Sequence, residues 1–401
     1  MTSFVTGLRC PRCGREPSHR EPQGLCSCGS PLLVEYDLDA MASKVPPESL
    51  AGRPPTMWRY EELLPVDDPA NVVTLDEGWT PLLPLAGLGG GIGLPGLWVK
   101  DEGRNPTGTF KARGASAGIS KAKELGIRDV ALPMAGNAGG AWAAYGAAAG
   151  IRVHVAMPND APEVNQLECR LHGADLMLVD GLISDAGALI AERSRERGWF
   201  DVATLKEPYR IEGKKTLGFE IAEQFGWRAP GAIVYPVGGG VGLIGIWRAM
   251  TQLRSVGWLQ GDTPRLIVTQ AEGCAPLVKA WEEGRAESEF WEGARTFAHG
   301  LRVPKALGDF LVLTAIRETG GTAIAVADDD IAGAMARLGG EGIAACPEGA
   351  ATFAAAAKLR ERGDLSGNER VVLINTGTAL KDPAALRRAT EGPLAPGDAA
   401  R

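Results

Sequence analysis

Short apolar runs alternate with longer Ala-rich or amphipathic segments along most of the chain. The apolar runs predict strands over residues 97–100, 129–134, 151–157, 176–179, 200–203, 232–237, 265–269 and 371–375. The intervening segments predict helices over residues 138–149, 162–173, 184–197 and 213–225, with further helices after Lys111 and after Leu243. Strands that alternate with helices of this length form parallel sheets covered on both faces. The pattern therefore predicts an α/β fold with two doubly wound, open parallel-sheet domains.

Changes in composition suggest where these domains begin and end. Residues 1–40 are cysteine-rich and form a candidate zinc-ribbon-like segment, and the Pro-rich residues 41–60 are typical of a linker. We expect a large domain made of residues 41–110 and 206–390, and a small α/β domain made of residues 111–205. The last residues, 391–401, are expected to form a flexible tail.

Length and charge exclude several classes of protein. A chain of 401 residues can bury a sizeable core in two or three domains. A net charge of −7 argues against nucleic acid or an anionic membrane as the main partner. The uncharged segment 130–151 is too rich in Gly and Ala to be a membrane span, and the N-terminus lacks a signal-peptide pattern. We therefore expect a cytoplasmic protein.

Four of the seven cysteines lie close together near the N-terminus, as Cys10-x-x-Cys13 and Cys26-x-Cys28. Two close pairs on tight turns can supply four thiolates to a structural zinc ion, which a reducing compartment favours over disulfides. The short Cys26–Cys28 spacing leaves a second interpretation, a ribbon that has lost its metal. A catalytic zinc is not expected, because four cysteines would leave no open position. The scattered cysteines Cys169, Cys274 and Cys346 are expected to be small buried side chains.

One lysine lies where a turn becomes a helix. Pro106 and Gly108 force a turn after the strand at residues 97–100, and Lys111 follows among Phe110 and small residues. Desolvation there would lower the pKa of the lysine and make its amine available for Schiff-base chemistry. The alternative is an ordinary solvent-facing lysine at the start of a helix.

Three further segments follow predicted strands, where ligands bind in open parallel sheets. The first carries Asn137, whose alternative role is to form the turn or cap the helix. The second is Gly238-Gly239-Gly240-Val241-Gly242, whose bare backbone N–H groups at a helix start suit a phosphate. It matches neither the dinucleotide nor the NTP motif, and its alternative is a plain strand-to-helix turn. The third offers the hydroxyl of Thr376.

A lysine, a phosphate cradle, an amide and a hydroxyl at strand ends are the groups that pyridoxal 5'-phosphate (PLP) requires. The motifs PTGTFKARG, AGNAGG, GGGVGL and TGTALKDP occur in that order. The chain thus resembles the fold type II (tryptophan synthase β-like) PLP-dependent enzymes, and within them the threonine synthases. The resemblance covers about residues 8–383, and the cysteine ribbon is similar to one at the start of many threonine synthases.

The resemblance implies a role for each site residue. Lys111 would form the Schiff base and later move protons at the substrate carbons. Asn137 would hydrogen-bond the phenolic oxygen of PLP, Thr376 would face its pyridine nitrogen, and residues 238–242 would bind its phosphate. Ala135, Gly136 and Arg210 would contact the amino-acid substrate, with Arg210 at the phosphate of the substrate. The alternative for Arg210 is a surface arginine at a helix start. The resemblance also implies a homodimer.

Departures from the family pattern bear on the substrate. Ala112, Ala138, Gly239, Gly242 and Thr378 stand where threonine synthases typically carry an acid, a threonine, two asparagines and a histidine. Several polar groups that could hold the phosphate of O-phosphohomoserine are therefore missing. The KARG and GGGVG variants look more like threonine dehydratases. Glu348 is a further acidic residue, to which the sequence assigns no role.

Three functional hypotheses follow. The first is a threonine synthase-like lyase, which converts O-phospho-L-homoserine and water to L-threonine and phosphate. The second is an ammonia-lyase or β-replacement enzyme that acts on a hydroxy- or diamino-acid, in the manner of a threonine or serine dehydratase. The third is a PLP-binding protein without catalytic activity, against which the presence of Lys111 argues.

Overall fold

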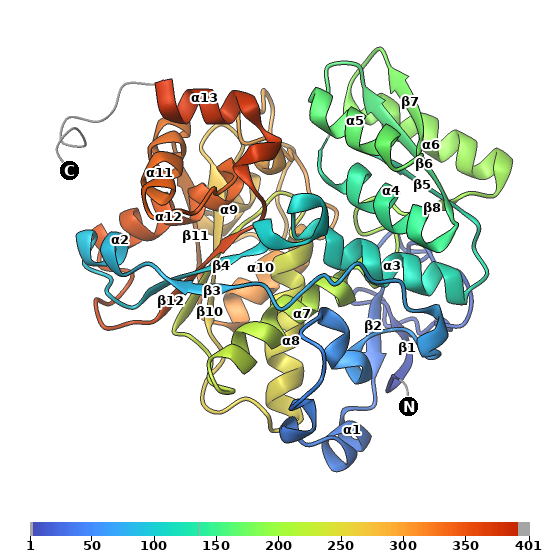
Figure 1. Ribbon diagram of the computed structural model, residues 1–401, viewed down its shortest axis with the longest axis horizontal. Coiled ribbons are helices and arrows are strands. Elements are labelled where there is room, and N and C mark those ends of the chain that lie inside the picture. The colour runs from blue at the N-terminus through green and yellow to red at the C-terminus, as the bar shows by residue number, and fades with distance from the viewer. Residues whose placement is uncertain (1–2, 135, 392–401) are drawn as a thin grey trace. The chain divides into compact units, whose positions relative to one another are not determined.

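The computed structural model describes residues 3–134 and 136–391 (Figure 1). The chain forms two compact units. Unit 1 comprises Met1–Trp79, Asn105–Glu220 and Ile244–Leu259, and unit 2 comprises Thr80–Arg104, Ile221–Leu243 and Gln260–Arg401. Two helices, α7 (Tyr209–Gln224) and α8 (Val241–Ser255), contribute residues to both units. The domain boundaries expected from the sequence differ from these bounds and stay a prediction.

Unit 1 contains a parallel sheet of four strands, in the order β7-β6-β5-β8. Its strands are β5 (Asp129–Pro133), β6 (Arg152–Pro158), β7 (Asp175–Val179) and β8 (Phe200–Asp201). Its helices are α3 (Lys111–Glu124), α4 (Ala138–Ala149), α5 (Glu163–Leu171) and α6 (Ile183–Arg197). Alternate residues of the strands face opposite sides, so that Val153 and Val155 pack with α3 and α4 whereas Ala156 packs under α6.

The remaining part of unit 1 precedes that sheet. It begins with β1 (Val5–Arg9) and β2 (Leu33–Tyr36), which pair antiparallel, and continues with α1 (Leu38–Lys44) and the 3-10 helices η1 (Pro47–Leu50), η2 (Met57–Leu63), η3 (Pro69–Asn71) and η5 (Pro106–Gly108). The linker expected over residues 41–60 was wrong. Leu50 and Met57 are buried there, and the ring of Tyr60 lies 5.2 Å from that of Phe219. The prolines mark ends of short helices in a packed segment.

Unit 2 contains, over its described residues, a sheet of six strands in the order β11-β10-β9-β12-β4-β3. The strands are β3 (Leu82–Pro84), β4 (Leu97–Asp101), β9 (Ala232–Pro236), β10 (Arg265–Ala271), β11 (Thr322–Val326) and β12 (Val371–Asn375). Strand β3 runs antiparallel to β4, and the other described pairs are parallel. Every residue of β9 and β12 is buried, as expected for a sheet covered on both faces.

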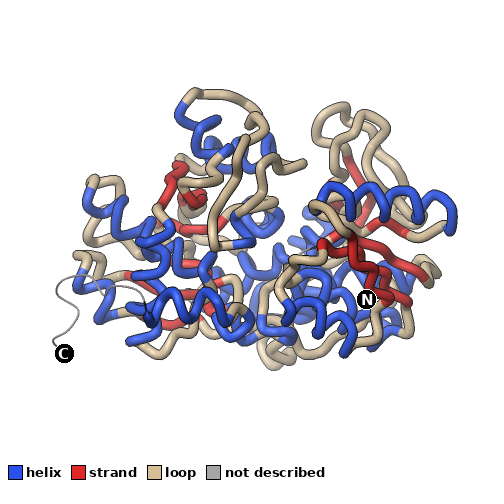
Figure 2. Tube along the Cα trace, turned by 90° about the horizontal axis from the view of Figure 1, so that it is seen from above, coloured by secondary structure: helices blue, strands red, loops and turns tan. Residues whose placement is uncertain are grey.

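Helices cover this sheet, and Figure 2 shows the red strands among the blue helices. The helices are α2 (Ala86–Gly91), η4 (Glu102–Arg104), α9 (Pro276–Glu282), η6 (His299–Leu301), α10 (Asp309–Glu318), α11 (Asp328–Gly340), α12 (Pro347–Glu361), η7 (Ala379–Lys381) and α13 (Pro383–Glu391). Helix α12 contacts β9, β10, β11 and β12, and its residues Ala350 and Phe353 belong to the hydrophobic core that the helix shares with these strands.

The predicted fold class is confirmed, with some boundaries moved. Helix α7 begins at Tyr209 rather than near Gly213, and α8 begins at Val241 rather than after Leu243. Strand β11 was not predicted. Of the expected tail, Glu391 ends α13 and the following residues lie outside the described part. Within the described part, none of the helices is both long and apolar enough to cross a membrane.

Candidate active site

In unit 1, Lys111 is the first residue of α3 and is half-buried. The preceding loop contains Thr107 and Gly108 with φ angles of 59° and 65°, a left-handed pair that turns the chain sharply into the helix. The Lys111 N–H donates to Thr109 Oγ1 at 3.3 Å, and its Nζ lies 4.7 Å from the centre of the Phe110 ring. Lys111 is thus only partly exposed, and its role as the Schiff-base lysine stays a prediction.

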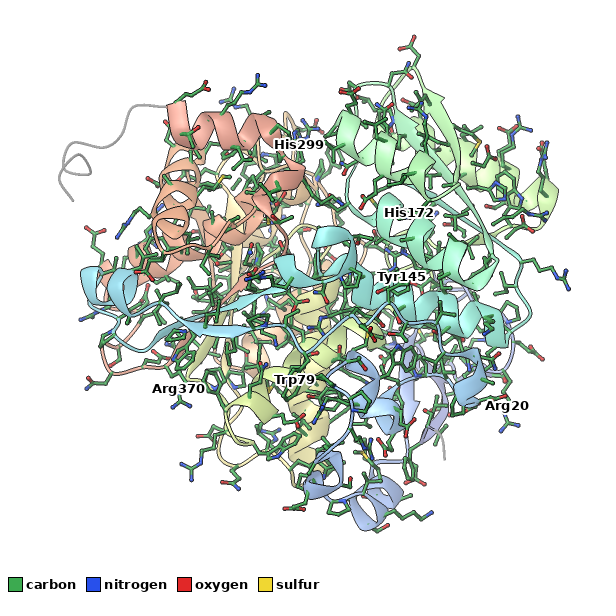
Figure 3. All side chains as sticks on the ribbon, in the orientation of Figure 1. Arg20, Trp79, Tyr145, His172, His299 and Arg370 are labelled. Carbon is green, nitrogen blue, oxygen red and sulfur yellow. The ribbon has the colours of Figure 1, made fainter. Side chains whose placement is uncertain are left out.

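A buried carboxylate fixes the position of this loop. Glu77 is fully buried and accepts hydrogen bonds from Trp58 Nε1 at 3.1 Å, Leu75 N–H at 2.9 Å and Tyr145 Oη at 2.5 Å. Tyr145, labelled in Figure 3, lies on α4, and burial together with the charge of Glu77 raises its pKa. The next residue, Gly78, donates its N–H to Asn105 Oδ1 at 3.0 Å. Residues 74–79 thus connect α4 to the loop that precedes Lys111.

Helices α3 and α7 cross at very short range. A Cβ atom on Gly213 would lie 1.9 Å from the carbonyl oxygen of Arg113, so only glycine fits. Arg113 is fully buried, and its guanidinium donates to both oxygens of Glu220 at 2.5 and 2.8 Å and to Thr216 Oγ1 at 2.9 Å. This bidentate pair holds α3, and with it Lys111, against α7.

Arg210 lies on the first turn of α7 and is 3% exposed. Its Nε donates to Glu207 Oε1 at 2.7 Å, its Nη2 donates to the Val202 carbonyl, and its guanidinium lies 5.1 Å from the Trp142 ring. The alternative of a surface arginine was wrong, because the side chain turns inward at the start of α7. Its contact with a substrate stays a prediction.

Lys214, one helical turn after Arg210, was not singled out from the sequence. It is 3% exposed, and its Nζ lies 4.5 Å from the centre of the same Phe110 ring that Lys111 approaches. Burial, followed by the charges of Lys111 and Arg210, lowers its pKa well below the usual value for lysine. Its i+4 spacing from Arg210 could have revealed it, but the expected helix start at Gly213 hid that spacing.

Asn137 precedes α4 at the end of β5. Its side chain makes no capping hydrogen bond to the helix, so the amide is not used in the alternative role of a helix cap. Helix α4 contacts η5, in the turn that precedes Lys111. Gly136 is half-buried beside Asn137, and Ala135 lies outside the described residues.

In unit 2, residues 238–242 join β9 to α8. Gly240 has φ = 77°, a conformation that favours glycine. A Cβ on Gly238 would lie 2.1 Å from the Gly300 carbonyl oxygen, and one on Gly242 would lie 1.8 Å from Tyr235 Oη. The loop therefore requires glycine sterically, and it presents bare backbone at the start of a helix. Its use as a phosphate site stays a prediction, and the plain-turn alternative remains open.

Thr376 follows β12, the neighbour of β9 in the sheet, so both site segments lie at the same edge. It is 7% exposed, and its Oγ1 lies 3.4 Å from the Sγ of Cys346, which caps α12. Burial raises the pKa of the Cys346 thiol well above its usual value, so the thiol stays protonated. The adjacent Asn375 donates from Nδ2 to Asp101 Oδ1 at 2.8 Å. As expected, Cys169, Cys274 and Cys346 are all buried.

Glu348, to which the sequence assigned no role, supports the glycine loop from behind. Its Oε1 accepts a hydrogen bond from the Gly300 N–H at 2.7 Å. The Gly300 carbonyl in turn packs against Gly238.

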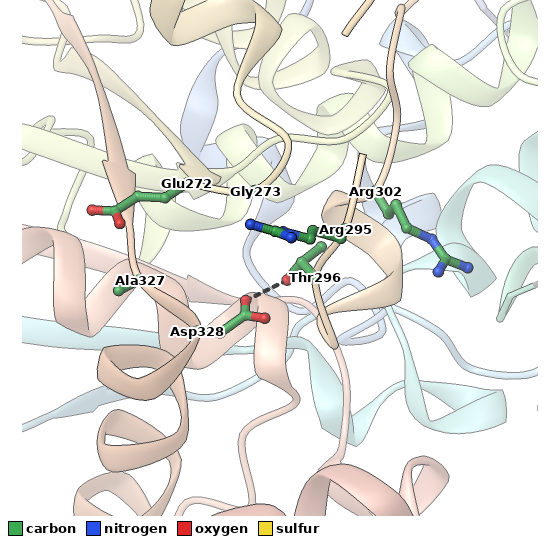
Figure 4. A pocket seen from close by; sticks show the side chains of 7 residues that line it. All are labelled: Glu272, Gly273, Arg295, Thr296, Arg302, Ala327 and Asp328. Carbon is green, nitrogen blue, oxygen red and sulfur yellow. Dashed lines mark hydrogen bonds between the residues drawn. The ribbon is translucent and has the colours of Figure 1, made fainter. Parts of the chain in front are cut away.

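A 560 Å³ pocket lies one strand further along this edge, after β10 and β11. Figure 4 shows its lining, with Thr296 Oγ1 donating to Asp328 Oδ1 at 2.6 Å. Residues 238–242 and Thr376 do not line it.

The four N-terminal cysteines come together, with all Sγ atoms within 4.8 Å of one another. The Sγ atoms of Cys10 and Cys28 lie 3.5 Å apart, as do those of Cys13 and Cys26. A tetrahedron with Zn–S bonds of about 2.3 Å has S···S separations of about 3.8 Å, so the thiols fit a metal. The two turns differ by one residue. In the first turn the Gly14 N–H donates to the Cys10 carbonyl, and in the second the Gly29 N–H donates to the Cys26 carbonyl. The second turn is one residue shorter, which accommodates the shorter spacing between Cys26 and Cys28.

The structure thus gathers the predicted site residues in two groups. Lys111, Gly136, Asn137 and Arg210 belong to unit 1, and residues 238–242 and Thr376 belong to unit 2. Glu77, Glu207, Lys214, Cys346 and Gly300 support these groups and were not predicted. Glu207 and Lys214 lie within four residues of Arg210, and the other three are distant in sequence from the predicted residues, so their contacts depend on the fold.

Comparisons with known proteins agree with these groups. A family described as "Pyridoxal-phosphate dependent enzyme" matches residues 73–377. The threonine synthase of Methanosarcina acetivorans is 38% identical over 391 residues, and that of Methanocaldococcus jannaschii is 34% identical over 388 residues. Each match covers 96% of this chain and 95% of the relative. The solved structure of the processed form of threonine deaminase isoform 2 from Solanum lycopersicum has a TM-score of 0.68 at 25% identity, covering 79% of this chain and 88% of that one.

The family match spans the segments that carry Lys111, Asn137, residues 238–242 and Thr376, and the relatives align over 96% of the chain. The protein is therefore a member of the pyridoxal phosphate-dependent enzymes and, among them, of the threonine synthase family.

Proposed function

We propose that the protein is a threonine synthase, a PLP-dependent lyase that converts O-phospho-L-homoserine and water to L-threonine and phosphate. The observation that carries this proposal is the identity to threonine synthases over 96% of the chain. The buried Arg210 beside Lys111 supports it, since an elimination of phosphate requires cationic groups near the leaving group.

The residues present fit PLP. A Cβ on Gly238 or Gly242 would fill space against the backbone or Tyr235, and the bare N–H groups at the start of α8 suit the phosphate. When bound, PLP supplies an electrophilic carbonyl carbon and a ring that withdraws electrons from the substrate carbons. Gly238, Gly239, Gly240, Val241 and Gly242 would hold the phosphate, and Thr376 would present its hydroxyl to the ring nitrogen.

Lys111 would hold the carbonyl carbon of the cofactor and then carry protons between substrate carbons. Its place at the start of α3, fixed by Asn105 and by the α3–α7 crossing, supports a rigidly positioned amine. Asn137 would donate its free amide to the phenolic oxygen. Because Thr376 is a neutral hydroxyl beside the neutral thiol of Cys346, it would not enforce protonation of the ring nitrogen.

A second candidate is an ammonia-lyase or β-replacement enzyme acting on a hydroxy- or diamino-acid. The structural similarity to the tomato threonine deaminase favours it, as does the loss of polar side chains at Ala138 and Gly239.

We also propose that the four cysteines bind a structural zinc ion, which their thiol geometry supports. A homodimer is expected, and light scattering would measure it.

A paired assay on PLP- and zinc-replete protein tests the two functions. One reaction follows inorganic phosphate and threonine from O-phosphohomoserine, and the other follows 2-oxo acid from threonine and serine. We expect phosphate and threonine in equal amounts, at a rate strongly reduced in Lys111→Ala and retained in the exposed control variant Lys123→Gln. Oxo acid without phosphate would replace the synthase by the ammonia-lyase, and neither product would contradict both.

A further inference from the structure

Three cationic side chains meet where α3 and α7 cross. Lys111 Nζ and Lys214 Nζ lie 4.7 and 4.5 Å from the centre of one ring, that of Phe110. A Cβ on Gly114 would lie 3.1 Å from Lys214 Cε and 3.2 Å from Arg210 Cβ, so the absence of a side chain at Gly114 makes room for both cations. The three side chains therefore occupy one small region of unit 1.

The carboxylate of Glu207, which lies near Lys214, is already used by other donors. The carboxylate of Glu207 accepts hydrogen bonds from Arg210 Nε at 2.7 Å and from the Tyr209 N–H at 2.7 Å. Lys214 is 97% buried, and among the described residues none accepts a hydrogen bond from its Nζ. A buried ammonium without a partner is unfavourable, and an anion would relieve that cost. Lys214 thus differs from the neighbouring Lys215, whose Nζ donates to Glu212.

We propose that Lys214, next to Arg210, is the second cation of an anion subsite that receives the phosphate group of the substrate. The proposal rests on the proposed function, which supplies a phosphorylated amino acid. A phosphate dianion offers several acceptor oxygens, so one group can accept hydrogen bonds from both Lys214 and Arg210. Lys214 would supply a cation to a site in which Ala138 supplies no hydroxyl.

Anion binding at this subsite is linked to proton uptake. Before the anion arrives, burial and the charges of Lys111 and Arg210 disfavour the protonated form of Lys214, and Glu207 favours it. A bound phosphate adds negative charge beside the amine and shifts Lys214 toward its protonated form. Binding of phosphate therefore takes up protons, whereas an arginine at this position would already be protonated.

The test is calorimetric titration of the holoenzyme with inorganic phosphate, in two buffers of different ionisation enthalpy. We expect Lys214→Gln to weaken phosphate binding about tenfold or more and to abolish the proton uptake. Lys214→Arg should keep most of the affinity and lose the uptake. Lys123→Gln, which removes an exposed charge from α3, should behave as the wild type. Unchanged phosphate affinity in Lys214→Gln, or no phosphate binding by the wild type, would overturn the proposal.

Steady-state kinetics separate this proposal from the proposed function. Lys214→Gln should raise KM for O-phosphohomoserine more than it lowers kcat. A lower kcat with unchanged phosphate binding would make Lys214 a proton-transfer group instead and sink the subsite. If the enzyme releases no phosphate from O-phosphohomoserine but still binds phosphate through Lys214, the function fails and the subsite stands. If Lys214→Gln does not fold, Lys214→Arg carries the test through the loss of proton uptake.

Discussion

Buried charges around Lys111 are mostly neutralised by a partner. Arg113 pairs with Glu220, Lys215 pairs with Glu212, and Glu77 collects hydrogen bonds from several donors. Removing one member of such a pair leaves the other buried and unpaired, which typically costs several kcal/mol. Lys214 is the exception, since its amine faces two cations.

This exception predicts a pH dependence of stability. A lysine whose pKa is lowered on folding binds its proton more readily in the unfolded chain, so the free energy of unfolding rises with pH up to the usual lysine value of 10.5. Lys214→Met should flatten this rise and stabilise the phosphate-free protein at pH 7. Urea unfolding between pH 7 and 9.5 measures both effects.

Lys123→Gln is the control for this test. Burial also lowers the pKa of Lys215, to about 8, which adds a rise of the same sign in every variant. The difference in pH dependence between Lys214→Met and Lys123→Gln therefore reports Lys214. An equal pH dependence in Lys214→Met and in wild type would show that Lys214 already has a partner in the folded protein.

At the level of single residues, sequence reasoning identified the groups that follow strands. Lys111, Asn137 and Thr376 could be found because strand ends and turns are readable from local patterns. The burial of Arg210 could not, because it depends on Glu207 and the Val202 carbonyl being folded against the start of α7. Lys214 was missed for a related reason, since its position relative to Arg210 depends on where α7 begins.

Among the elements, the crossing of α3 and α7 determines where Lys111 lies. Gly213→Ala would place a Cβ 1.9 Å from the Arg113 carbonyl oxygen and force the helices apart. We expect the free energy of unfolding to fall by about 1 to 3 kcal/mol and kcat to fall with it. Denaturant unfolding and steady-state kinetics are the measurements.

The matched control is Gly187→Ala in α6, where a Cβ would meet open space. It should raise stability by up to about 1 kcal/mol through helix propensity and leave kcat unchanged. Similar losses in both variants would mean that the short crossing does not hold α3 in place.

The loop at residues 238–242 predicts a loss of cofactor without a general loss of folding. Gly238→Ala would place a Cβ 2.1 Å from the Gly300 carbonyl oxygen and displace the backbone that would hold the phosphate. We expect PLP affinity to fall at least about tenfold, measured by absorbance titration of the apoprotein. Gly333→Ala, an exposed position in α11 where a Cβ meets open space, should keep full affinity.

Element prediction succeeded where burial is continuous and failed where composition misleads. The strands β5, β9 and β12 are short apolar runs and were found nearly to the residue. Residues 41–60 were misread because Pro47 begins a 3-10 helix and the following segment packs as another, and composition cannot show packing. Strand β11 follows Gly320 and Gly321 in an Ala-rich stretch, where its apolar signal is weak.

For the whole molecule, the cysteine ribbon is tied to the helices that bear the site. Tyr36 Oη donates to Glu212 Oε2 on α7 at 2.8 Å, and Arg248 on α8 donates to the Val34 carbonyl. Zinc removal should therefore lower the melting temperature of the protein as a whole, by several degrees.

A chelator or Cys28→Ser would test this, with zinc content by atomic absorption and melting by calorimetry. Ser27→Ala, which leaves all four thiols in place, is the control. Unchanged melting after the metal is removed would mean that the ribbon holds together through its strand pairing alone.

The shared position of two amines over Phe110 also affects how the catalytic lysine can be verified. Replacing Lys111 leaves a second primary amine, that of Lys214, beside the same ring and with a lowered pKa. A neutral amine is a nucleophile, so the Lys111→Ala protein retains a group able to condense with an aldehyde. Yellow colour or residual turnover in Lys111→Ala would then mean that Lys214 forms the Schiff base in place of Lys111. The proper blank is Lys111→Ala combined with Lys214→Gln.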